Sequence, residues 1–405
     1  MELKSSKKNQ AVVIATGFFT LFSLIGIMFY GLPFFYDFWV KELGWSRAKV
    51  TSGDAVAKIV VGLFGFFAGW LMDKFGPKRL MIIGVIMCGL AFIGLGHFTS
   101  LWQFYFFYIL SATSYILAGA LPNQVLISRW FTSGRGKAMG IAYLGVGIGG
   151  MLVPQIARWL NAHYGWHTAL TIMGILIIAI SLPLVLLVKD APPGFTENIS
   201  TGKKPRIPMS QLFKSKAFIL LVIGSVCSIA AVAGTIKNLK LFFSLDLKFT
   251  QEHAANILSI ILFSSIIGRL LMGWLADKFS KKYVMVLIYA LVAVAIPLLY
   301  FTNVPGIIYI FAFLFGIALG GDYMIIPLMA AELFGVKVLG RIMGLVLTFD
   351  GFGDALSPML VSWIRDKSGS YTNGFAVLIV LAIIGTIAVL LIPQKKKTGD
   401  AGANG

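Results

Sequence analysis

The sequence predicts an all-α membrane protein with twelve transmembrane helices arranged as two parallel six-helix pseudo-repeats. Three observations predict this fold: the composition, a series of apolar runs and an internal repeat. The chain has 405 residues, of which 58% are hydrophobic and 12% are charged. An ordinary soluble domain carries about 25% charged residues. The mean hydropathy is +0.87, so the chain has too little polar surface for a soluble protein and belongs in a membrane.

Apolar runs define the expected helices, because a helix needs about 20 apolar residues to cross the hydrocarbon core. The first run follows Lys4, Lys7 and Lys8, as a signal peptide would, but it is too long and lacks a small-residue cleavage site. We therefore assign it as the first of twelve helices. The helices are expected near residues 11–36, 48–71, 79–97, 102–128, 136–162, 167–188, 215–245, 251–275, 282–302, 305–333, 337–364 and 372–393.

The net charge of +18 comes from 34 Lys and Arg against 16 Asp and Glu. In a soluble chain this excess would indicate a nucleic-acid partner, which the lack of polar surface excludes here. If both termini are cytoplasmic, the inner segments hold 23 Lys and Arg and the outer segments hold seven. By the positive-inside rule we expect a multi-pass protein of the inner or plasma membrane with both termini in the cytoplasm.

One long hydrophilic connection divides the chain. It contains Pro192, Pro193 and a basic cluster of Lys203, Lys204 and Arg206. We expect an N-terminal half at 1–188, a cytoplasmic linker loop at 189–216, a C-terminal half at 217–394 and a cytoplasmic tail at 395–405. Basic cytoplasmic loops are attracted to anionic headgroups, so membrane lipids are expected partners.

A repeat relates the two halves. The segment Gly69-Trp70-Leu71-Met72-Asp73-Lys74-Phe75 recurs as Gly273-Trp274-Leu275-Ala276-Asp277-Lys278-Phe279, with six identities in seven and an offset of 204 residues. Both copies run from an outer loop through a helix into an inner loop, so the halves are parallel repeats. Such repeats place a substrate site near the bilayer midplane, between two halves that rock about it.

The pattern Gly69-x-x-x-Asp73-Lys74-x-Gly76-x-Lys78-Arg79 resembles the hallmark loop of the major facilitator superfamily, and the second copy has Ser280 in place of the second glycine. The resemblance implies the major facilitator fold and secondary active transport by alternating access. The residues of the loop also indicate a physical role. An Asp at the inner end of a helix can accept hydrogen bonds from the free amides of a neighbouring helix N-terminus.

These features predict a gate at the inner end. Asp73 and Asp277 would lock that end shut, while Lys74, Arg79 and Lys278 would anchor the loops at the headgroups. The alternative is that both acids are merely solvated loop residues.

Further segments resemble the branch of monocarboxylate transporters and oxalate/formate antiporters: Gly44-Trp45-Ser46-Arg47, Arg129-Trp130-Phe131, Arg135-Gly136-Lys137-Ala138-Met139-Gly140, Gly165-Trp166, Ser368-Gly369-Ser370-Tyr371 and Gly268-Arg269. The resemblance implies that Arg269 binds a substrate carboxylate. The chain departs from the branch at three positions. Ser265 and Phe34 replace an aspartate and a lysine of the monocarboxylate transporters, and the stretch around Asp350 replaces a lysine of the antiporters. The missing second cation argues against oxalate.

Eight charged side chains lie inside the expected helices and away from the helix ends, and each is a functional candidate because embedding a charge costs several kcal/mol. They are Asp54, Lys58, Lys237, Lys240, Arg269, Asp322, Asp350 and Asp354. Asp54 and Lys58 stand at the spacing of an intrahelical ion pair. Such a pair either stabilises the helix or takes part in function. The planar guanidinium of Arg269 suits a carboxylate. Its alternative role is a permanent ion pair with Asp350 or Asp322.

The acids are candidates for proton coupling. Asp350 and Asp354 share one helix face, and two like charges in low dielectric cannot both ionise cheaply. Asp322 follows a Gly320-Gly321 break. We favour Asp350 as the proton carrier, because the family comparison places it at a ligand position.

Other candidates line the expected cavity. Lys237 with Asn238 would supply a second cation for an anion, whereas snorkelling to the headgroups is the simpler reading for Lys240. Tyr115 and Asn123 lie on the fourth helix, which faces the cavity in the family, beside Ser114 and Gln124. The aromatic candidates for the wall, which in the alternative face lipid or a neighbouring helix, are Phe18, Phe22, Phe29, Tyr30, Phe34, Tyr115, Tyr143 and Tyr323.

Nothing in the sequence indicates catalysis. Cys88 and Cys227 lie in apolar runs, and the four histidines have no metal-ligand spacing. We expect no enzyme activity, no metal, no cofactor and no obligate protein partner. The first hypothesis is a proton-coupled transporter of a small organic anion, a monocarboxylate. The alternatives are a proton-coupled carrier or exchanger of a zwitterionic or cationic solute, suggested by the embedded acids, and a non-transporting membrane sensor.

Overall fold

The computed structural model describes residues 2–192 and 209–393, and every regular element within these ranges is a helix. The expected tail at 395–405 and most of the expected linker at 189–216 lie outside the described residues. The first part of the chain contains α1 (Glu2–Ile25), η1 (Gly26–Gly31), η2 (Leu32–Phe35), α2 (Tyr36–Glu42), α3 (Arg47–Phe75), α4 (Pro77–Leu95), α5 (Leu101–Ala118), α6 (Ala120–Trp130) and α7 (Arg135–Leu187).

The second part follows the same order of long helices. It contains α8 (Met209–Lys214), α9 (Lys216–Leu241), η3 (Phe242–Asp246), α10 (Gln251–Lys278), α11 (Lys281–Ala295), η4 (Ile296–Phe301), α12 (Ile307–Phe334), η5 (Val336–Val338), α13 (Leu339–Ser368) and α14 (Thr372–Leu390).

Nine helices of the described residues are long and apolar enough to cross a membrane, and the two bent parts of α3 together make a tenth. One of the nine, α7, has 53 residues and breaks at Gly165, where φ is 73°. At 1.5 Å per residue it is more than twice the length of a roughly 30 Å hydrocarbon core, so it supplies two spans. The remaining span is α13, whose embedded Asp350 and Asp354 lower its hydropathy. The twelve-helix, all-α membrane fold is confirmed.

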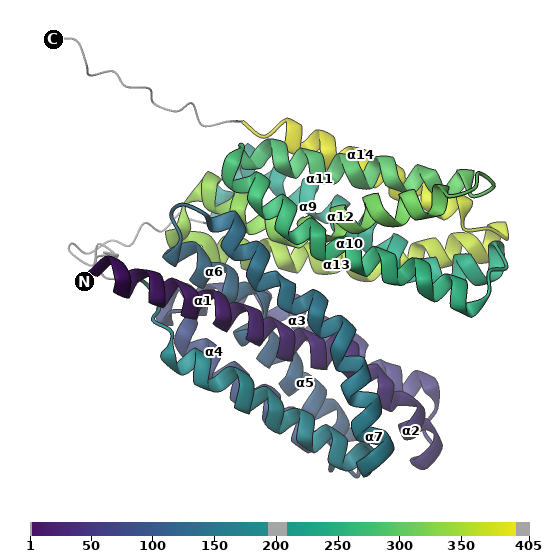
Figure 1. Ribbon diagram of the computed structural model, residues 1–405, viewed down its shortest axis with the longest axis horizontal. Coiled ribbons are helices and arrows are strands. Elements are labelled where there is room, and N and C mark those ends of the chain that lie inside the picture. Colours follow the sequence, from purple (N-terminus) through teal and green to yellow (C-terminus); the bar gives the residue numbers. More distant parts are fainter. Residues whose placement is uncertain (1, 193–208, 394–405) are drawn as a thin grey trace.

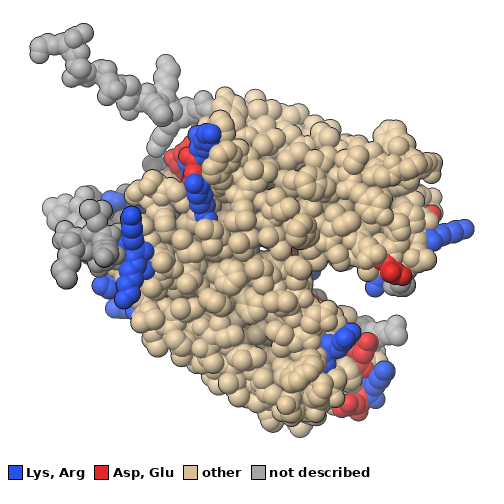
Figure 2. All heavy atoms as spheres, in the orientation of Figure 1, with Lys and Arg blue, Asp and Glu red and all other residues tan. Residues whose placement is uncertain are grey.

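The long helices form two bundles, α1 to α7 and α9 to α14, that lie side by side (Figure 1). Helix α1 begins and α14 ends at the same end of the molecule (Figure 1). The bundles touch where α3 packs against α13 and α7 packs against α10. At the opposite end a deep notch separates them (Figure 2). We call these the closed end and the open end.

Glycine allows the close contact between the bundles. A Cβ atom on Gly69 would collide with the carbonyl oxygen of Gly340, and one on Gly136 would collide with that of Gly273. Helices that pack through such small residues bring their backbones together without a side chain between them. Both contacts lie toward the closed end, next to the repeated Asp73 and Asp277.

Candidate functional site

Arg269 lies on α10 where the two bundles face each other. Its side chain is buried, with 9% of the residue exposed, and its Nη1 donates to Oγ of Ser265, one turn earlier, at 2.8 Å. A Cβ atom on Gly147 of α7 would stand only 3.0 Å from Nη1. The groups that act on Arg269 electrostatically are Tyr30 and Tyr143. An ion pair with Asp322 or Asp350 is absent from the described residues, so the alternative role expected for Arg269 is not the one found.

A wall of tyrosines in the first bundle faces Arg269. Nε2 of Gln124 donates to the Tyr143 hydroxyl at 2.6 Å. The ring of Tyr30 covers Gly150, with ring atoms 3.3 Å from where a Cβ would stand. Tyr115 interacts electrostatically with Tyr30, and its ring lies edge to face with Phe29, with 5.2 Å between the ring centroids. Of the expected residues, Tyr115 therefore lies in the wall.

Lys237 and Asp354 form an ion pair between α9 and α13. The Nζ of Lys237 lies 2.8 Å from Oδ2 of Asp354, and the two side chains are 39% and 29% exposed. The side chain of Lys58 on α3 interacts with Lys237 from the other bundle. Lys237 is therefore paired within its own bundle, and its role as a second cation for an anion stays a prediction. Exposed Tyr323 interacts electrostatically with Asp354 and with Tyr115.

The acid beside Asp350 is Asp322 and not the expected Asp354. Asp322 and Asp350 are fully buried, at 0% and 2% exposure, and interact with one another electrostatically. Ser228 donates to Oδ1 of Asp322 at 3.1 Å. Residues four apart on α13 share a face, but Asp354 turns toward Lys237 while Asp350 points into the second bundle. Ser225, Ser228 and Tyr289 join this cluster.

Two expected binding residues have their hydrogen bonds satisfied within their own bundles. Asn238 donates to the Gly234 carbonyl at 2.9 Å and accepts from Ser362 at 2.9 Å, which joins α9 to α13. Asn123 donates to the Gly119 carbonyl at 2.7 Å and bonds Thr20, which supports the break between α5 and α6. Both side chains are buried, and their expected contact with a substrate stays a prediction. Phe34, in η2, is exposed.

Asp54 interacts with tyrosines as well as with Lys58. Both of its carboxylate oxygens lie 2.7 Å from the Tyr36 hydroxyl, which donates to them. The Tyr108 hydroxyl donates in turn to Tyr36 at 3.3 Å. Lys58 acts on Asp54 only electrostatically. The sequence gives no sign of this tyrosine chain, because Tyr36 and Tyr108 lie on other helices.

The repeated acids bind helix N-termini across the two bundles. Asp277 accepts the backbone N–H of Gly136 at 2.6 Å and that of Lys137 at 2.8 Å, both in the first turn of α7. Asp73 accepts the N–H of Arg341 in α13 at 3.3 Å, and its side chain is only 6% exposed. These are the contacts expected from helix dipoles, so neither acid is a solvated loop residue. Their gating role stays a prediction.

The basic residues of the two loops have other contacts. The Nζ atoms of Lys74 and Lys278 lie over the rings of Trp70 and Trp274, each 4.9 Å from the ring centroid. Arg79 is exposed in the first turn of α4. Their anchoring at the headgroup layer, where cations are favoured, stays a prediction.

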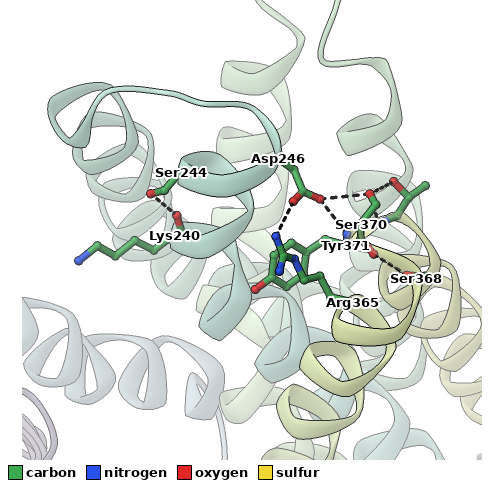
Figure 3. Close-up of polar contacts among 8 residues, drawn as sticks. Lys240, Ser244, Asp246, Arg365, Ser368, Ser370 and Tyr371 are labelled. Atoms are coloured by element: carbon green, nitrogen blue, oxygen red, sulfur yellow. Dashed lines mark hydrogen bonds and ion pairs between the residues drawn. The ribbon is translucent and has the colours of Figure 1, made fainter.

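At the open end an acid joins the first and last spans of each bundle. Asp246, at the end of η3, accepts the N–H of Tyr371 at 2.8 Å and the Ser370 hydroxyl at 3.1 Å, and lies 3.7 Å from Arg365 (Figure 3). In the first bundle, Trp166 donates to Glu42 at 2.6 Å. The repeat offset of 204 residues maps Glu42 onto Asp246 and Trp166 onto Ser370. We call these two contacts the open-end ties.

A metal site is not indicated, since no group of three or more His, Cys, Asp or Glu side chains in residues 2–192 and 209–393 could hold a metal ion. The geometry instead offers an unpaired guanidinium between two bundles, a wall of tyrosines and a separate buried pair of acids. Such a set can bind an anion and hold protons.

Known proteins resemble this chain over nearly its whole length. Rat (Rattus norvegicus) monocarboxylate transporter 13 is 28% identical over 389 residues, covering 95% of this chain and 89% of the relative. The cis,cis-muconate transport protein of Acinetobacter baylyi is 23% identical, covering 86% of each. The solved proton:xylose symporter XylE superposes with a TM-score of 0.71 at 17% identity and covers 97% of both chains, which shows the shared fold.

The family model of the Major Facilitator Superfamily matches residues 11–255 and 225–405. Together these matches cover the helices of both bundles and therefore the whole site. The chain is thus a multi-pass membrane transporter of a small-molecule substrate and not an enzyme, and it belongs to the Major Facilitator Superfamily, where it resembles the monocarboxylate transporter branch.

Proposed function

We propose that this transporter moves a small organic anion, a monocarboxylate, with proton symport. The observation that carries the proposal is Arg269, a buried cation between the bundles whose electrostatic partners are tyrosines and not acids. A buried charge without a counter-charge is costly. A substrate carboxylate can supply that counter-charge through two parallel N–H···O bonds. The names of the muconate and monocarboxylate relatives support an organic anion, and the second name supports a monocarboxylate.

Proton coupling is supported by the embedded acids. Asp322 and Asp350 are buried without a cation among their electrostatic partners. Asp354 is paired with Lys237 in the structure, which makes it the weakest of the three candidates. A carrier that moves an anion with a proton needs such a group, since coupling requires that one site respond to the occupancy of the other.

The orientation follows the charge distribution. We assign the closed end, where α1 begins and α14 ends, to the cytoplasm of a cell that carries this protein in its inner or plasma membrane. The 23 inner against seven outer Lys and Arg support this. The basic linker around Lys203 would then face anionic lipid headgroups. In this orientation the notch is the entry for substrate from outside, and the two halves close it by rocking.

Uptake into proteoliposomes tests the substrate class. With the outside more acidic than the inside, lactate or pyruvate is expected to accumulate in the vesicles. Arg269→Lys should lower the initial rate of uptake at least about tenfold, because loss of the two parallel hydrogen bonds of the guanidinium costs about 1.4 kcal/mol or more. Arg269→Gln should abolish uptake. Lys240→Gln removes a cation that is exposed at the open end of α9 and serves as the matched control.

Two outcomes contradict the proposal. Normal pH-driven uptake by Arg269→Gln would show that the Arg269 guanidinium does not bind the substrate. Uptake of amines or zwitterions, with no monocarboxylate uptake, would favour the alternative substrate class that the embedded acids suggest.

A further inference from the structure

Four buried oxygen atoms without a hydrogen-bond partner lie inside the second bundle. They are Oδ2 of Asp322, Oδ1 and Oδ2 of Asp350, and the hydroxyl of Tyr289. Tyr289 is 0% exposed, and both carboxylates act on its hydroxyl electrostatically. Tyr289 is thus a buried, unpartnered donor that faces the two acids from a third helix. Buried polar atoms in native proteins nearly always have partners, so this cluster requires something to complete it.

The polar and titratable groups that act on the two acids come from four helices of the second bundle. Helix α9 contributes Ser225, Ser228 and Cys227, α11 contributes Tyr289, α12 contributes Asp322 and Tyr323, and α13 contributes Asp350. Lys, Arg and His are absent from the electrostatic partners of both acids within the described residues. The cluster consists of oxygen atoms and one thiol, and it holds two carboxylates without a counter-charge.

Two ionised carboxylates in this position are unfavourable, since each buried ion costs several kcal/mol and like charges repel. One proton removes one of the charges. The protonated carboxyl group also gains an O–H donor, and hydrogen bonds to a carboxylate are the stronger kind. A single shared proton therefore removes one of the two buried charges and adds a donor to the cluster.

The same proton balances the embedded charge. Asp354 is paired with Lys237 and Asp54 interacts with Lys58, so each of these sets is neutral. Lys240 is exposed at the end of α9. Arg269, Asp322 and Asp350 remain, with a net charge of −1 when both acids are ionised. One shared proton brings this set to zero.

We propose that Asp322 and Asp350 share one proton in the empty transporter and take up a second when an anion binds to Arg269. The inference rests on the proposed function for the identity of that anion. An anion adds one negative charge to the neutral set, and a second proton cancels it. The embedded charges of the empty transporter and of the loaded transporter then both sum to zero, so the membrane potential does no work when either one changes conformation. One proton then moves with each monocarboxylate, and the acids that hold it lie inside the second bundle, with no electrostatic contact to Arg269 among the described residues.

Infrared spectroscopy of the purified full chain tests the shared proton without substrate. At neutral pH the protein is expected to show the carbonyl stretch of a protonated carboxyl group, shifted in heavy water. The band should disappear in Asp322→Asn and in Asp350→Asn, and shift in Tyr289→Phe. Asp366→Asn, an exposed acid at the open end, is the matched control and should leave the band unchanged. The proposal would be overturned if the band is absent or if it persists in both Asn variants. It would also be overturned if the band is lost when sodium chloride replaces choline chloride, because Na⁺ and not a proton would then occupy the acids.

Transport by the same variants tests the second proton. Asn mimics an acid that is permanently protonated. Each single variant should therefore still accumulate monocarboxylate when a pH gradient is applied. Its uptake should not change when valinomycin and a potassium gradient set a membrane potential. The double variant Asp322→Asn/Asp350→Asn should lose accumulation but keep exchange of labelled for unlabelled anion, which also shows that it is folded. Accumulation by the double variant would overturn the proposal. If the wild-type chain moves no monocarboxylate, the proposed function fails while the infrared result still decides the shared proton.

Discussion

Single residues decide how closely the two bundles approach. Gly136 and Gly273 face each other with only backbone between them, as do Gly69 and Gly340. The adjacent acids Asp73 and Asp277 can reach helix N-termini across the interface only because no side chain stands between the helices. The closed end therefore has one such contact from each repeat, with Asp277 accepting two backbone N–H groups and Asp73 one.

Replacing Gly136 by alanine should destabilise this end. The added Cβ meets the Gly273 carbonyl oxygen and lies 3.0 Å from Oδ1 of Asp277, so one of the helices must shift. We expect a loss of about 1–3 kcal/mol, as for other overpacked sites, read as a lower midpoint of thermal unfolding in detergent. Gly62→Ala is the matched control, because nothing lies within 4 Å of its added Cβ. Equal midpoints for both variants would contradict this account.

Helix ends carry the contacts between the bundles. Helices α7 and α13 each begin at the closed end and point their free amides at a carboxylate of the other bundle. The positive end of a helix dipole favours a negative charge by typically 0.3–1 kcal/mol and up to about 2 kcal/mol in partly buried geometry. The closed end is therefore held by two contacts of modest strength.

Asp277→Asn should weaken one of these contacts and shift the population toward opening at the closed end. The amide can still accept one hydrogen bond but lacks the charge, so a shift of about 1 kcal/mol, or roughly fivefold in population, is expected. Spin labels on α4 and α11 at that end would report it as a longer distance component. Asp366→Asn removes a charge at the open end and should leave the distances unchanged. An unaltered distribution in Asp277→Asn would rule out a gating role for this acid.

The sequence predicts the helices and the contacts of the repeated acids, but not which side of each helix faces its neighbours. The apolar runs locate the spans because hydrophobic length is a local property. The contacts of Asp277 were predictable from the repeat and the helix dipole. The pairing of Asp354 with Lys237, and of Asp350 with Asp322, depends on how α13 is rotated against α9 and α12. Tyr289 gives no signal either, because it stands in a uniformly apolar run where periodicity does not mark a face.

At the scale of the whole molecule, the two ends are built differently. The open-end ties, Glu42 with Trp166 and Asp246 with Ser370 and Tyr371, each lie within one bundle. The contacts of Asp73 and Asp277 join the two bundles. Rocking of rigid halves breaks only contacts of the second kind. The open-end ties therefore keep the first and last spans of each bundle moving together.

Asp246→Ala should free the end of η3 without disturbing the closed end. Faster amide hydrogen exchange is expected at residues 242–247 and 370–373, since Asp246 no longer holds the Tyr371 amide, and the exchange of α7 should stay unchanged. Transport should slow, because part of each rocking movement is lost to local bending. Faster exchange throughout the second bundle would instead show that Asp246 stabilises the fold as a whole.

The contacts at the closed end also bear on the direction of transport. Water can take the place of each carboxylate at a helix N-terminus, and a hydrogen bond to a charged group that is exchanged with water contributes about 1.5–3 kcal/mol net. Opening this end therefore replaces two carboxylate contacts by hydration and exposes little that water cannot serve. These two contacts alone therefore hold the closed end by only a few kcal/mol, which is the order of magnitude that a reversible carrier requires. The direction of transport would then follow the solute gradients of the cell and not a preference built into the protein.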